Sequence, residues 1–540
     1  MTSTAGYILD ALIDVGMQEL FCLPGVQNDE LFDELFARKG SLRAIQTRHE
    51  QGAAYMALGA ACASGRPQAY CVVPGPGLLN TTAALSTAYG LGARVLALSG
   101  EIPSGAIGKG IGLLHEIPDQ SAVLESLTKW QTRIDSGDEA SAKVTLALAQ
   151  LLAGRPRPVG LQVPMDVWAQ TAVHNNGADA ALTTSESTVD ETKVDAVARM
   201  LLGARNPLIL VGSGALDAAD DVRRIAERVQ APVVAQRTGH GVMDSRHYLS
   251  ATSPLGHELW RDADVVLGIG TRGQQRAAWG SDEQLKYLSI NLDAHDAACH
   301  GEPTVNIVAD AAIACAALND ALAQQNVTPP SREAELTAKK ADMTARLHAK
   351  LAPQQAFVEA IRMALPDDGI FVDELTQVGF VSRMTFPTYA PRTFLSTGYQ
   401  GTLGWGFATA LGAKVACPDQ AVVAVSGDGG FMFNIQELAT AVLHQINTVT
   451  VVFNDGAFGN VRRIQQERLN GQTIASELHN PSFARIAEEF GALGIVAETP
   501  AAVGAAIKQG LDAGRPTIVE VPIGELPSPW EFIMLPKVRG

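Results

Sequence analysis

Residues 421–460, AVVAVSGDGGFMFNIQELATAVLHQINTVTVVFNDGAFGN, constrain the fold more than any other stretch of the chain. Small and β-branched residues alternate up to Gly427, and apolar residues then recur at helical spacing from Ile435 to Leu443. A second β-branched run covers residues 449–453. This order predicts a strand, a tight turn, a helix and a second strand. A crossover this short favours a right-handed parallel pair of strands.

Two acidic residues follow the two strands of this unit. Asp428 and Asp455 are expected to lie close together, because the carboxyl ends of parallel strands share one edge of a sheet. Gly427, Gly429 and Gly430 allow the main chain to approach an anion, and the following helix presents N–H groups to a phosphate. Gly-Asp-Gly alone is common in simple turns. The second acid therefore carries the prediction of a Mg²⁺ diphosphate site.

The whole unit resembles the signature of thiamine diphosphate enzymes, a GDG followed after one helix and one strand by NN or ND. This superfamily includes acetolactate synthase, pyruvate decarboxylase and benzoylformate decarboxylase. The resemblance implies that the metal ligands are Asp428, Asp455 and the main-chain carbonyl of Ala457. We also expect Phe458 to contact the cofactor and to line the substrate pocket. The family usually has asparagine where Asp455 stands. The additional negative charge can tighten metal binding or change the preferred metal.

Near the N-terminus, a predicted strand over residues 42–47 leads into RHEQGAAYMA, where Glu50 begins an alanine-rich helix. The helix dipole alone favours a carboxylate at this position. The segment also resembles the family's HExxAAxMA helix, which implies that Glu50 is the catalytic carboxylate that hydrogen-bonds the aminopyrimidine ring and activates the cofactor. Pro24 and Gly25 follow another predicted strand, over residues 21–23, and are expected to contact the cofactor.

His115 follows a glycine-rich loop over residues 105–112. A lone histidine in a loop is most often a surface residue. Acetolactate synthases carry glutamine at the matching position, whereas a histidine can act as an acid or a base. We therefore expect His115 to be catalytic and to line the substrate pocket. Val26 is expected in the same pocket, where decarboxylase relatives carry a polar residue.

In the last third of the chain, residues 398–404 precede a predicted helix. Leu403 has the spacing of a core residue, but it matches the family's bulky apolar residue that keeps the cofactor bent. Gly401 matches the glycine whose carbonyl receives the aminopyrimidine, and Gln400 is expected in the substrate pocket. Thr376 and Gln377 follow the strand predicted over residues 370–372, where family members place a residue that contacts the diphosphate.

Composition sets the class of protein. The chain has 540 residues, 46% hydrophobic and 18% charged, which is typical of an α/β enzyme with about three domains. We expect three Rossmann-like parallel-sheet domains: residues 1–170 for the pyrimidine, 190–330 as the central domain and 350–535 for the diphosphate. Residues 171–190 have the composition of a linker.

The net charge of −16 argues against nucleic-acid and anionic-membrane partners. The six cysteines never form a CxxC motif, and the N-terminus has no signal sequence, which indicates a cytoplasmic protein with reduced thiols.

The central part contains a strand ending in Gly212-Ser213-Gly214, but Asp217 stands where a dinucleotide fingerprint needs its third glycine. Thr271, Arg272 and Asp293 are the best candidates for nucleotide contacts, although each also suits an ordinary strand end. The matching domain binds FAD in some family members and no ligand in many decarboxylases. We expect no bound FAD.

The resemblance covers the whole chain. It implies an enzyme that uses thiamine diphosphate and Mg²⁺ to cleave or form a C–C bond next to a carbonyl, and we expect a 2-oxo acid decarboxylase or carboligase. The alternatives are an acetolactate synthase-like pyruvate carboligase, a 1,2-diketone hydrolase and a non-catalytic paralogue. In this family the activating carboxylate and the metal signature come from opposite subunits. We therefore expect a homodimer or homotetramer with active sites at the subunit interface.

Overall fold

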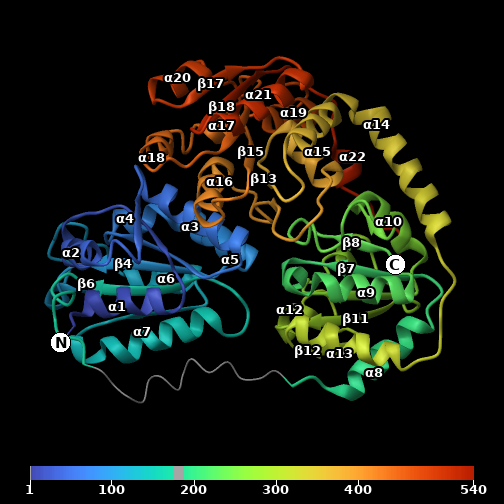
Figure 1. The fold of residues 1–540 in the computed structure, drawn as a ribbon, viewed down its shortest axis with the longest axis horizontal. Helices are drawn as coiled ribbons and strands as arrows, with labels where there is room; N and C mark the ends of the chain where they lie inside the picture. The colour runs from blue at the N-terminus through green and yellow to red at the C-terminus, as the bar shows by residue number, and fades with distance from the viewer. Residues whose placement is uncertain (1, 174–187) are drawn as a thin grey trace. The chain divides into compact units, whose positions relative to one another are not determined.

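The computed structural model describes residues 2–173 and 188–540, which form three six-stranded sheets with helices between the strands (Figure 1). The expected α/β class with three Rossmann-like parallel sheets is confirmed. The first sheet has the order β2-β1-β3-β4-β6-β5, and its pairings are parallel. Its strands are Glu19–Cys22 (β1), Arg43–Gln46 (β2), Gln68–Val72 (β3), Val95–Glu101 (β4), Trp130–Arg133 (β5) and Val159–Pro164 (β6).

Helices and short 3-10 turns connect these strands, so the loops that follow the strands open at one edge of the first sheet. They are Thr4–Asp14 (α1), Val26–Asn28 (η1), Asp29–Ala37 (α2), Glu50–Ser64 (α3), Pro76–Asn80 (α4), Thr82–Leu91 (α5), Ser104–Ala106 (η2), Gln120–Leu127 (α6) and Gly137–Leu152 (α7). The helix predicted to begin at Glu50 is confirmed.

The central sheet has the order β12-β11-β10-β7-β8-β9, which is the strand order of a doubly wound Rossmann fold. Its strands β7 and β10 are buried throughout, because helices cover a parallel sheet on both faces. The strands are Pro207–Val211 (β7), Val233–Ala235 (β8), Ser250–Ala251 (β9), Val265–Ile269 (β10), Lys286–Asn291 (β11) and Val305–Val308 (β12). The helices are Glu191–Leu202 (α8), Ser213–Ala218 (η4), Ala219–Val229 (α9), Ser253–Asp262 (α10), Gln275–Ala278 (α11), Ala294–Ala298 (α12) and Ala311–Ala323 (α13).

The third sheet has the order β14-β13-β15-β16-β18-β17, which repeats the order of the first sheet when each is numbered from its own first strand. Its strands are Ile370–Val372 (β13), Phe394–Leu395 (β14), Val422–Gly427 (β15), Val449–Asn454 (β16), Leu493–Val496 (β17) and Thr517–Pro522 (β18). The helices of this part are Glu333–Ala364 (α14), Gln377–Thr385 (α15), Trp405–Ala416 (α16), Asp428–Phe431 (α17), Glu437–Leu443 (α18), Gly459–Arg468 (α19), Phe483–Glu489 (α20), Pro500–Asp512 (α21) and Trp530–Ile533 (α22).

The strand, turn, helix and strand predicted around the GDG are present, with one correction. The predicted tight turn at residues 427–430 is a short helix, α17, and the predicted helix is α18, which begins at Glu437. Asn434 lies in the break between them, and its side-chain amide donates to the carbonyl of Gly404 at 2.6 Å. This contact gives the chain a hydrogen-bond partner away from the helix axis, which explains why the helical pattern is interrupted here.

By compactness the chain divides into two units, which are described separately. The first comprises Met1–Thr184, Thr397–Glu498 and Ala505–Ile523, and the second comprises Ser185–Ser396, Thr499–Gly504 and Gly524–Gly540. The three domain ranges expected from the sequence stay a prediction. Of the expected linker, residues 174–187 lie outside the described part of the chain. No helix in the described ranges is both long and apolar enough to cross a membrane.

Within the first unit, α3 packs directly against α16 through glycines. A Cβ atom on Gly59 would lie 2.1 Å from the carbonyl oxygen of Thr409, and one on Gly412 would lie 1.8 Å from that of Met56. Both distances are far below van der Waals contact, so the two main chains touch only because these positions lack side chains. The lack of a side chain at these two positions therefore permits the close packing of α3 and α16.

Within the second unit, the C-terminal tail packs on the core of the central sheet. Phe532, Ile533, Leu535 and Val538 contact this core, and the N–H of Val538 donates to the carbonyl of Trp279 at 2.9 Å. In the structure the apolar residues of the tail stabilise the central domain.

Candidate active site

Asp428 begins α17 directly after β15, and Asp455 directly follows β16. The two strands are parallel neighbours, which confirms that both acids lie at the carboxyl ends of adjacent strands. The Asp428 side chain is buried, and its Oδ1 accepts the N–H of Gly429 at 2.8 Å. Its Oδ2 accepts the N–H of Gly456 at 2.9 Å. The loop after β16 is thus joined to the GDG turn by the carboxylate itself.

Asn480 is a further partner of Asp428, and no motif in the sequence singled it out. Its side-chain amide donates to Asp428 Oδ2 at 2.6 Å and to Asn454 Oδ1 at 3.0 Å. Asn454 in turn donates to Glu520 at 3.1 Å. One amide therefore connects the ends of both strands and fixes the orientation of the Asp428 carboxylate. Only the fold brings it there, from 52 residues further along the chain.

The electrostatics of this edge suit a divalent cation. Burial raises the pKa of the Asp428 carboxyl above its usual value, and its hydrogen-bond donors within the described residues are neutral amides. A buried carboxylate without a cationic partner is costly, and a bound cation would offset that cost. The donor set of carboxylate and carbonyl oxygens fits Mg²⁺. No cluster of three or more His, Cys, Asp or Glu side chains suited to a metal occurs in the described ranges.

The residues around Asp455 shape the same loop. Asp455 Oδ1 accepts the N–H of Ala457 at 3.2 Å. A Cβ on Gly459 would lie 2.4 Å from Asp455 Oδ2, and one on Gly429 would lie 2.6 Å from the ring of Phe458. The missing side chains therefore make room for the carboxylate and for the aromatic ring. The ring of Phe458 lies against the GDG turn, and its place in a substrate pocket stays a prediction.

Glu50 lies at the first position of α3, with His49 as the residue that caps the helix. Its side chain is 12% exposed, and its Oε2 accepts the side-chain amide of Asn80 at 3.0 Å. Asn80 ends α4 and was not predicted as a site residue. The carboxylate is therefore oriented by an amide and remains partly accessible to a ligand.

The start of α4, with its capping residue Gly75, lies close to both predicted catalytic residues. A Cβ on Gly75 would lie 2.2 Å from the carbonyl oxygen of His115, and one on Gly77 would lie 3.6 Å from Glu50 Oε1. Gly75 has φ +57°, and His115 has φ +67°, which is unusual for a residue with a side chain. His115 Nδ1 is buried and has no hydrogen-bond partner among the described residues.

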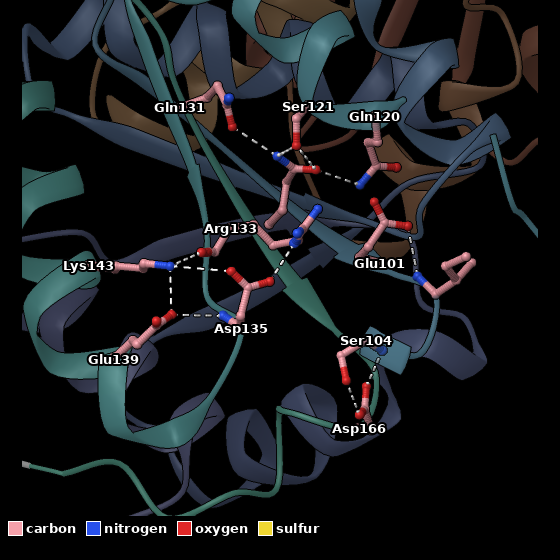
Figure 2. A network of polar contacts seen from close by, with 12 residues as sticks. Glu101, Ser104, Gln120, Ser121, Gln131, Arg133, Asp135, Glu139, Lys143 and Asp166 are labelled. Carbon is pink, nitrogen blue, oxygen red and sulfur yellow. Dashed lines mark hydrogen bonds and ion pairs between the residues drawn. The ribbon is translucent and has the colours of Figure 1, made fainter. Parts of the chain in front are cut away.

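Two glutamines fix the loops around His115. Gln27 donates to the carbonyl of Leu114 at 3.3 Å, which joins the Val26 turn to the His115 segment. Gln120 accepts the N–H of Gly75 at 2.9 Å and donates to the carbonyl of Gly100, also at 2.9 Å. Figure 2 shows Gln120, Ser121 and Gln131 directed toward one shared amide, which is that of Gln162.

These contacts bring the loops after β1, β3 and β4 together. Pro24, Gly25 and Val26 belong to the first of these loops, and Val26 is exposed. The predicted pocket residues Val26 and His115 therefore share this edge of the first sheet.

The segment before α16 carries the other predicted cofactor contacts. Gly401 has φ +60° and Gly404 has φ +81°, so glycine suits both positions. The hydroxyl of Thr402 lies 3.0 Å from that of Thr87 on α5, which fixes the segment next to the first sheet's helices. Leu403 is half-buried and Gln400 is exposed, so both side chains are partly accessible.

Thr376 and Gln377 belong to the second unit, at the start of α15. Gln377 donates to the carbonyl of Gly524 at 3.2 Å and accepts the N–H of Leu526 at 2.7 Å. Both ends of its side-chain amide thus bind the C-terminal tail. The expectation that it contacts a diphosphate stays a prediction.

In the central domain, the turn after β7 contacts the turn after β10. Gly214 donates its N–H to the carbonyl of Gly270 at 3.2 Å. Arg272 pairs with Asp296 at 3.3 Å, and Asp293 caps α12. These partners lie within the domain itself, and the expected absence of FAD stays a prediction.

Three family profiles match the chain in the expected order. They describe the N-terminal, central and C-terminal domains of thiamine pyrophosphate enzymes, and they match residues 2–123, 194–318 and 376–521. A probable 2-ketoarginine decarboxylase of Pseudomonas aeruginosa is 32% identical, over 91% of this chain and 89% of its own length.

The acetolactate synthase isozyme 3 large subunit of Escherichia coli is 26% identical over 95% of this chain and 93% of its own length. A sulfoacetaldehyde acetyltransferase of Castellaniella defragrans is 27% identical over 96% of this chain and 93% of its own length. Similarity therefore extends over nearly the full length of relatives with several activities. The chain belongs to the family of thiamine pyrophosphate enzymes, which use thiamine diphosphate as their cofactor.

Proposed function

We propose that the protein is a 2-oxo acid decarboxylase that uses thiamine diphosphate and Mg²⁺, and that it replaces the released carbon dioxide with a proton or a second carbonyl compound. The environment of His115 carries the proposal. Its buried Nδ1 has no partner among the described residues, and the loop that touches its main chain also approaches Glu50. A histidine so placed can exchange a proton with a substrate. The similarity to a probable 2-ketoarginine decarboxylase supports decarboxylation.

The remaining residues receive roles consistent with their surroundings. Asp428, Asp455 and the carbonyl of Ala457 would bind Mg²⁺, and Glu50, oriented by Asn80, would hydrogen-bond the aminopyrimidine ring. When bound, thiamine diphosphate supplies the carbon nucleophile that adds to the substrate carbonyl. Leu403 would support the cofactor from its half-buried position.

We also propose that the protein assembles as a homodimer or homotetramer whose active sites lie between subunits. Each site would then combine the Glu50 edge of one subunit with the Asp428 edge of another. Several exposed apolar side chains close to these edges support an interface there, and they include Val26, Leu79, Leu114, Met432 and Phe433. The cytoplasm is the proposed location.

A pyruvate carboligase is the second candidate, and the similarity to acetolactate synthase over 93% of that protein's length favours it. The two candidates differ in the acceptor, because a decarboxylase protonates the carbon that a carboligase joins to a second carbonyl compound. Measuring the release of carbon dioxide separates both from a 1,2-diketone hydrolase, which releases none.

The test is a screen of 2-oxo acids, including pyruvate and 2-ketoarginine, and of 1,2-diketones in the presence of thiamine diphosphate and Mg²⁺. We expect carbon dioxide and an aldehyde from at least one 2-oxo acid. On that substrate, His115→Ala should lower turnover by about a hundredfold, the lower range for loss of an acid–base group. His295→Ala, at an exposed position of α12, is the matched control.

Three outcomes would contradict parts of this proposal. Ligated product from pyruvate without free aldehyde would favour the carboligase. Cleavage of a diketone without carbon dioxide from any 2-oxo acid would favour the hydrolase. An unchanged rate of His115→Ala on every substrate found would exclude its role in proton transfer.

A further inference from the structure

Helix α18 contacts the segment that leads into Glu50, and it does so through a buried carboxylate. Glu437, the first residue of α18, is fully buried. Its Oε2 accepts the N–H of Arg48 at 3.1 Å, and its Oε1 accepts the N–H of His49 at 3.0 Å. The hydroxyl of Thr440 donates to Oε2 at 2.6 Å. Both carboxylate oxygens are thus engaged, and two of the donors are the main-chain amides directly before Glu50.

The other end of the same helix contacts the same segment. His444, the residue that follows α18, accepts the N–H of Gln46 at its Nε2 atom, at 3.2 Å. Its own carbonyl accepts from the guanidinium of Arg43 at 3.0 Å. Burial lowers the pKa of the His444 imidazole, which favours the neutral form that can accept a hydrogen bond. The segment over residues 43–49 is therefore bound at two points along one helix.

The side chain of Glu437 packs tightly against the main chain of α3. A Cβ on Gly52 would lie 2.4 Å from Glu437 Oε1, so the carboxylate lies directly against the first turn of that helix. Burial raises the pKa of Glu437, which shows that its charged form is costly at this position. Apolar packing would stabilise the contact at lower cost, but it would not orient the main-chain amides.

We propose that Glu437 is a positioning residue for Glu50. Glu437 fixes the main-chain amides one and two residues before Glu50. The side-chain amide of Asn80 fixes the carboxylate of Glu50 itself. His444 supports the same segment at Gln46. Glu437 lies on the helix that follows the GDG turn, so it ties the position of Glu50 to the diphosphate-binding part of the same chain. The inference rests on the proposed role of Glu50 toward the aminopyrimidine ring.

The test measures amide hydrogen exchange in the full-length protein, without turnover. For Glu437→Ala we expect exchange of the amides of Arg48 and His49 to rise about tenfold or more, because two hydrogen bonds to a charged acceptor are lost. Glu437→Gln should give a smaller rise, since one acceptor oxygen remains while an amide nitrogen now faces a donor. Glu488→Gln makes the same chemical change at an exposed position of α20 and should have no effect.

The second readout is the affinity for thiamine diphosphate, measured by calorimetry in the presence of Mg²⁺. A displaced Glu50 should weaken binding about tenfold in Glu437→Ala, the loss expected for one hydrogen bond to a charged group. His444→Ala tests the other contact. It should raise exchange at Gln46 and leave Arg48 and His49 protected. Glu437→Gln, the milder change, keeps the inference testable if Glu437→Ala does not fold.

Two results would overturn the inference. One is exchange at Arg48 and His49 that stays within about twofold of the unchanged protein in Glu437→Ala, well below the effect of losing a charged hydrogen bond. The other is unchanged thiamine diphosphate affinity in the same variant. A failure of the proposed function would instead appear as a lack of 2-oxo acid turnover in the unchanged protein, which neither readout uses.

Discussion

At the scale of single residues, Asp455 gives this site its most distinctive chemistry. Asp455 follows β16, and the buried Asp428 follows β15, the parallel neighbour of β16 in the sheet. Two carboxylates at one edge repel each other without a cation and attract a divalent cation more strongly than one carboxylate and one amide. Asp455 should therefore raise metal affinity and make the metal-free protein less stable.

Asp455→Asn tests this expectation. Replacing the carboxylate by an amide should weaken Mg²⁺ binding about tenfold, because the number of charged ligands sets divalent affinity. The measurement is the Mg²⁺ concentration that half-saturates the thermal stabilisation given by excess thiamine diphosphate. Asp419→Asn removes the same charge at an exposed position before β15 and is the control. Equal Mg²⁺ midpoints for all three proteins would mean that Asp455 contributes no charge to the metal site.

Sequence reasoning located the residues that lie at strand ends. Asp428, Asp455 and Glu50 were placed correctly because strand periodicity and turn residues indicate where each strand stops. Three supporting residues were missed: Asn480, which binds Asp428, Asn80, which binds Glu50, and Glu437, which binds the main chain before Glu50. Each is an ordinary polar residue whose contact partner is set by tertiary structure. Glu437 did leave one signal, since a carboxylate within an apolar helical run must find a buried partner.

At the scale of elements, the contact between α3 and α16 determines where Glu50 lies. Glu50 is the first residue of α3, and Gly59 is nine positions further along the same helix, where the main chains of α3 and α16 touch. Because Gly412 makes the reciprocal contact on α16, a side chain at either position would separate the helices. The same separation would move the segment that Glu437 binds.

We therefore expect Gly59→Ala and Gly412→Ala each to destabilise the protein by about 3 kcal/mol, the upper range for overpacking a core. Helix propensity alone predicts the opposite sign, a gain of about 1 kcal/mol for alanine in a helix. Since both changes separate the same helix pair, the double variant should lose less than the sum of the two. Denaturant unfolding measures these differences.

Gly40→Ala is the control for both variants, because a Cβ there would contact no other atom within 4 Å. Its stability should change by less than about 0.5 kcal/mol, as for most surface substitutions. Stabilisation by either helix variant would contradict the close contact.

The boundaries of the helices after the GDG could be predicted from the sequence only in part. The two strands and the helix of the GDG unit were recovered, but the predicted turn is itself a short helix, α17, and a break separates it from α18. Residues 435–443 have continuous apolar spacing, so nothing local indicated that α18 begins only at Glu437. The break depends on Asn434 reaching Gly404 of a distant segment, and local periodicity does not report such long-range hydrogen bonds.

At the scale of the whole molecule, the end of the chain stabilises its middle. After β18, the tail binds Gln377 through Gly524 and Leu526, and it then packs its apolar side chains on the central core. The ring of His257 lies 2.8 Å from the carbonyl of Pro536, and a Cβ on Gly280 would lie 1.8 Å from that of Arg539. The surface that the tail covers includes residues more than 200 positions earlier in the chain, so local sequence does not reveal this contact.

We predict that the tail contributes to the stability of the second unit without taking part in catalysis. Phe532→Ala should destabilise it by about 2 kcal/mol, because the half-buried ring loses part of its contact with the central core. Met534→Ala is the matched control, since Met534 is 73% exposed.

Removing residues 529–540 spares Gly524 and Leu526 and should lower the thermal midpoint further. Phe532→Ala and the shortened protein both retain the contacts between Gln377 and the tail. Their affinity for thiamine diphosphate should therefore stay unchanged at 25 °C, within about twofold as expected for a distant site. A loss of cofactor affinity in Phe532→Ala that Met534→Ala does not share would mean that the tail acts on the active site.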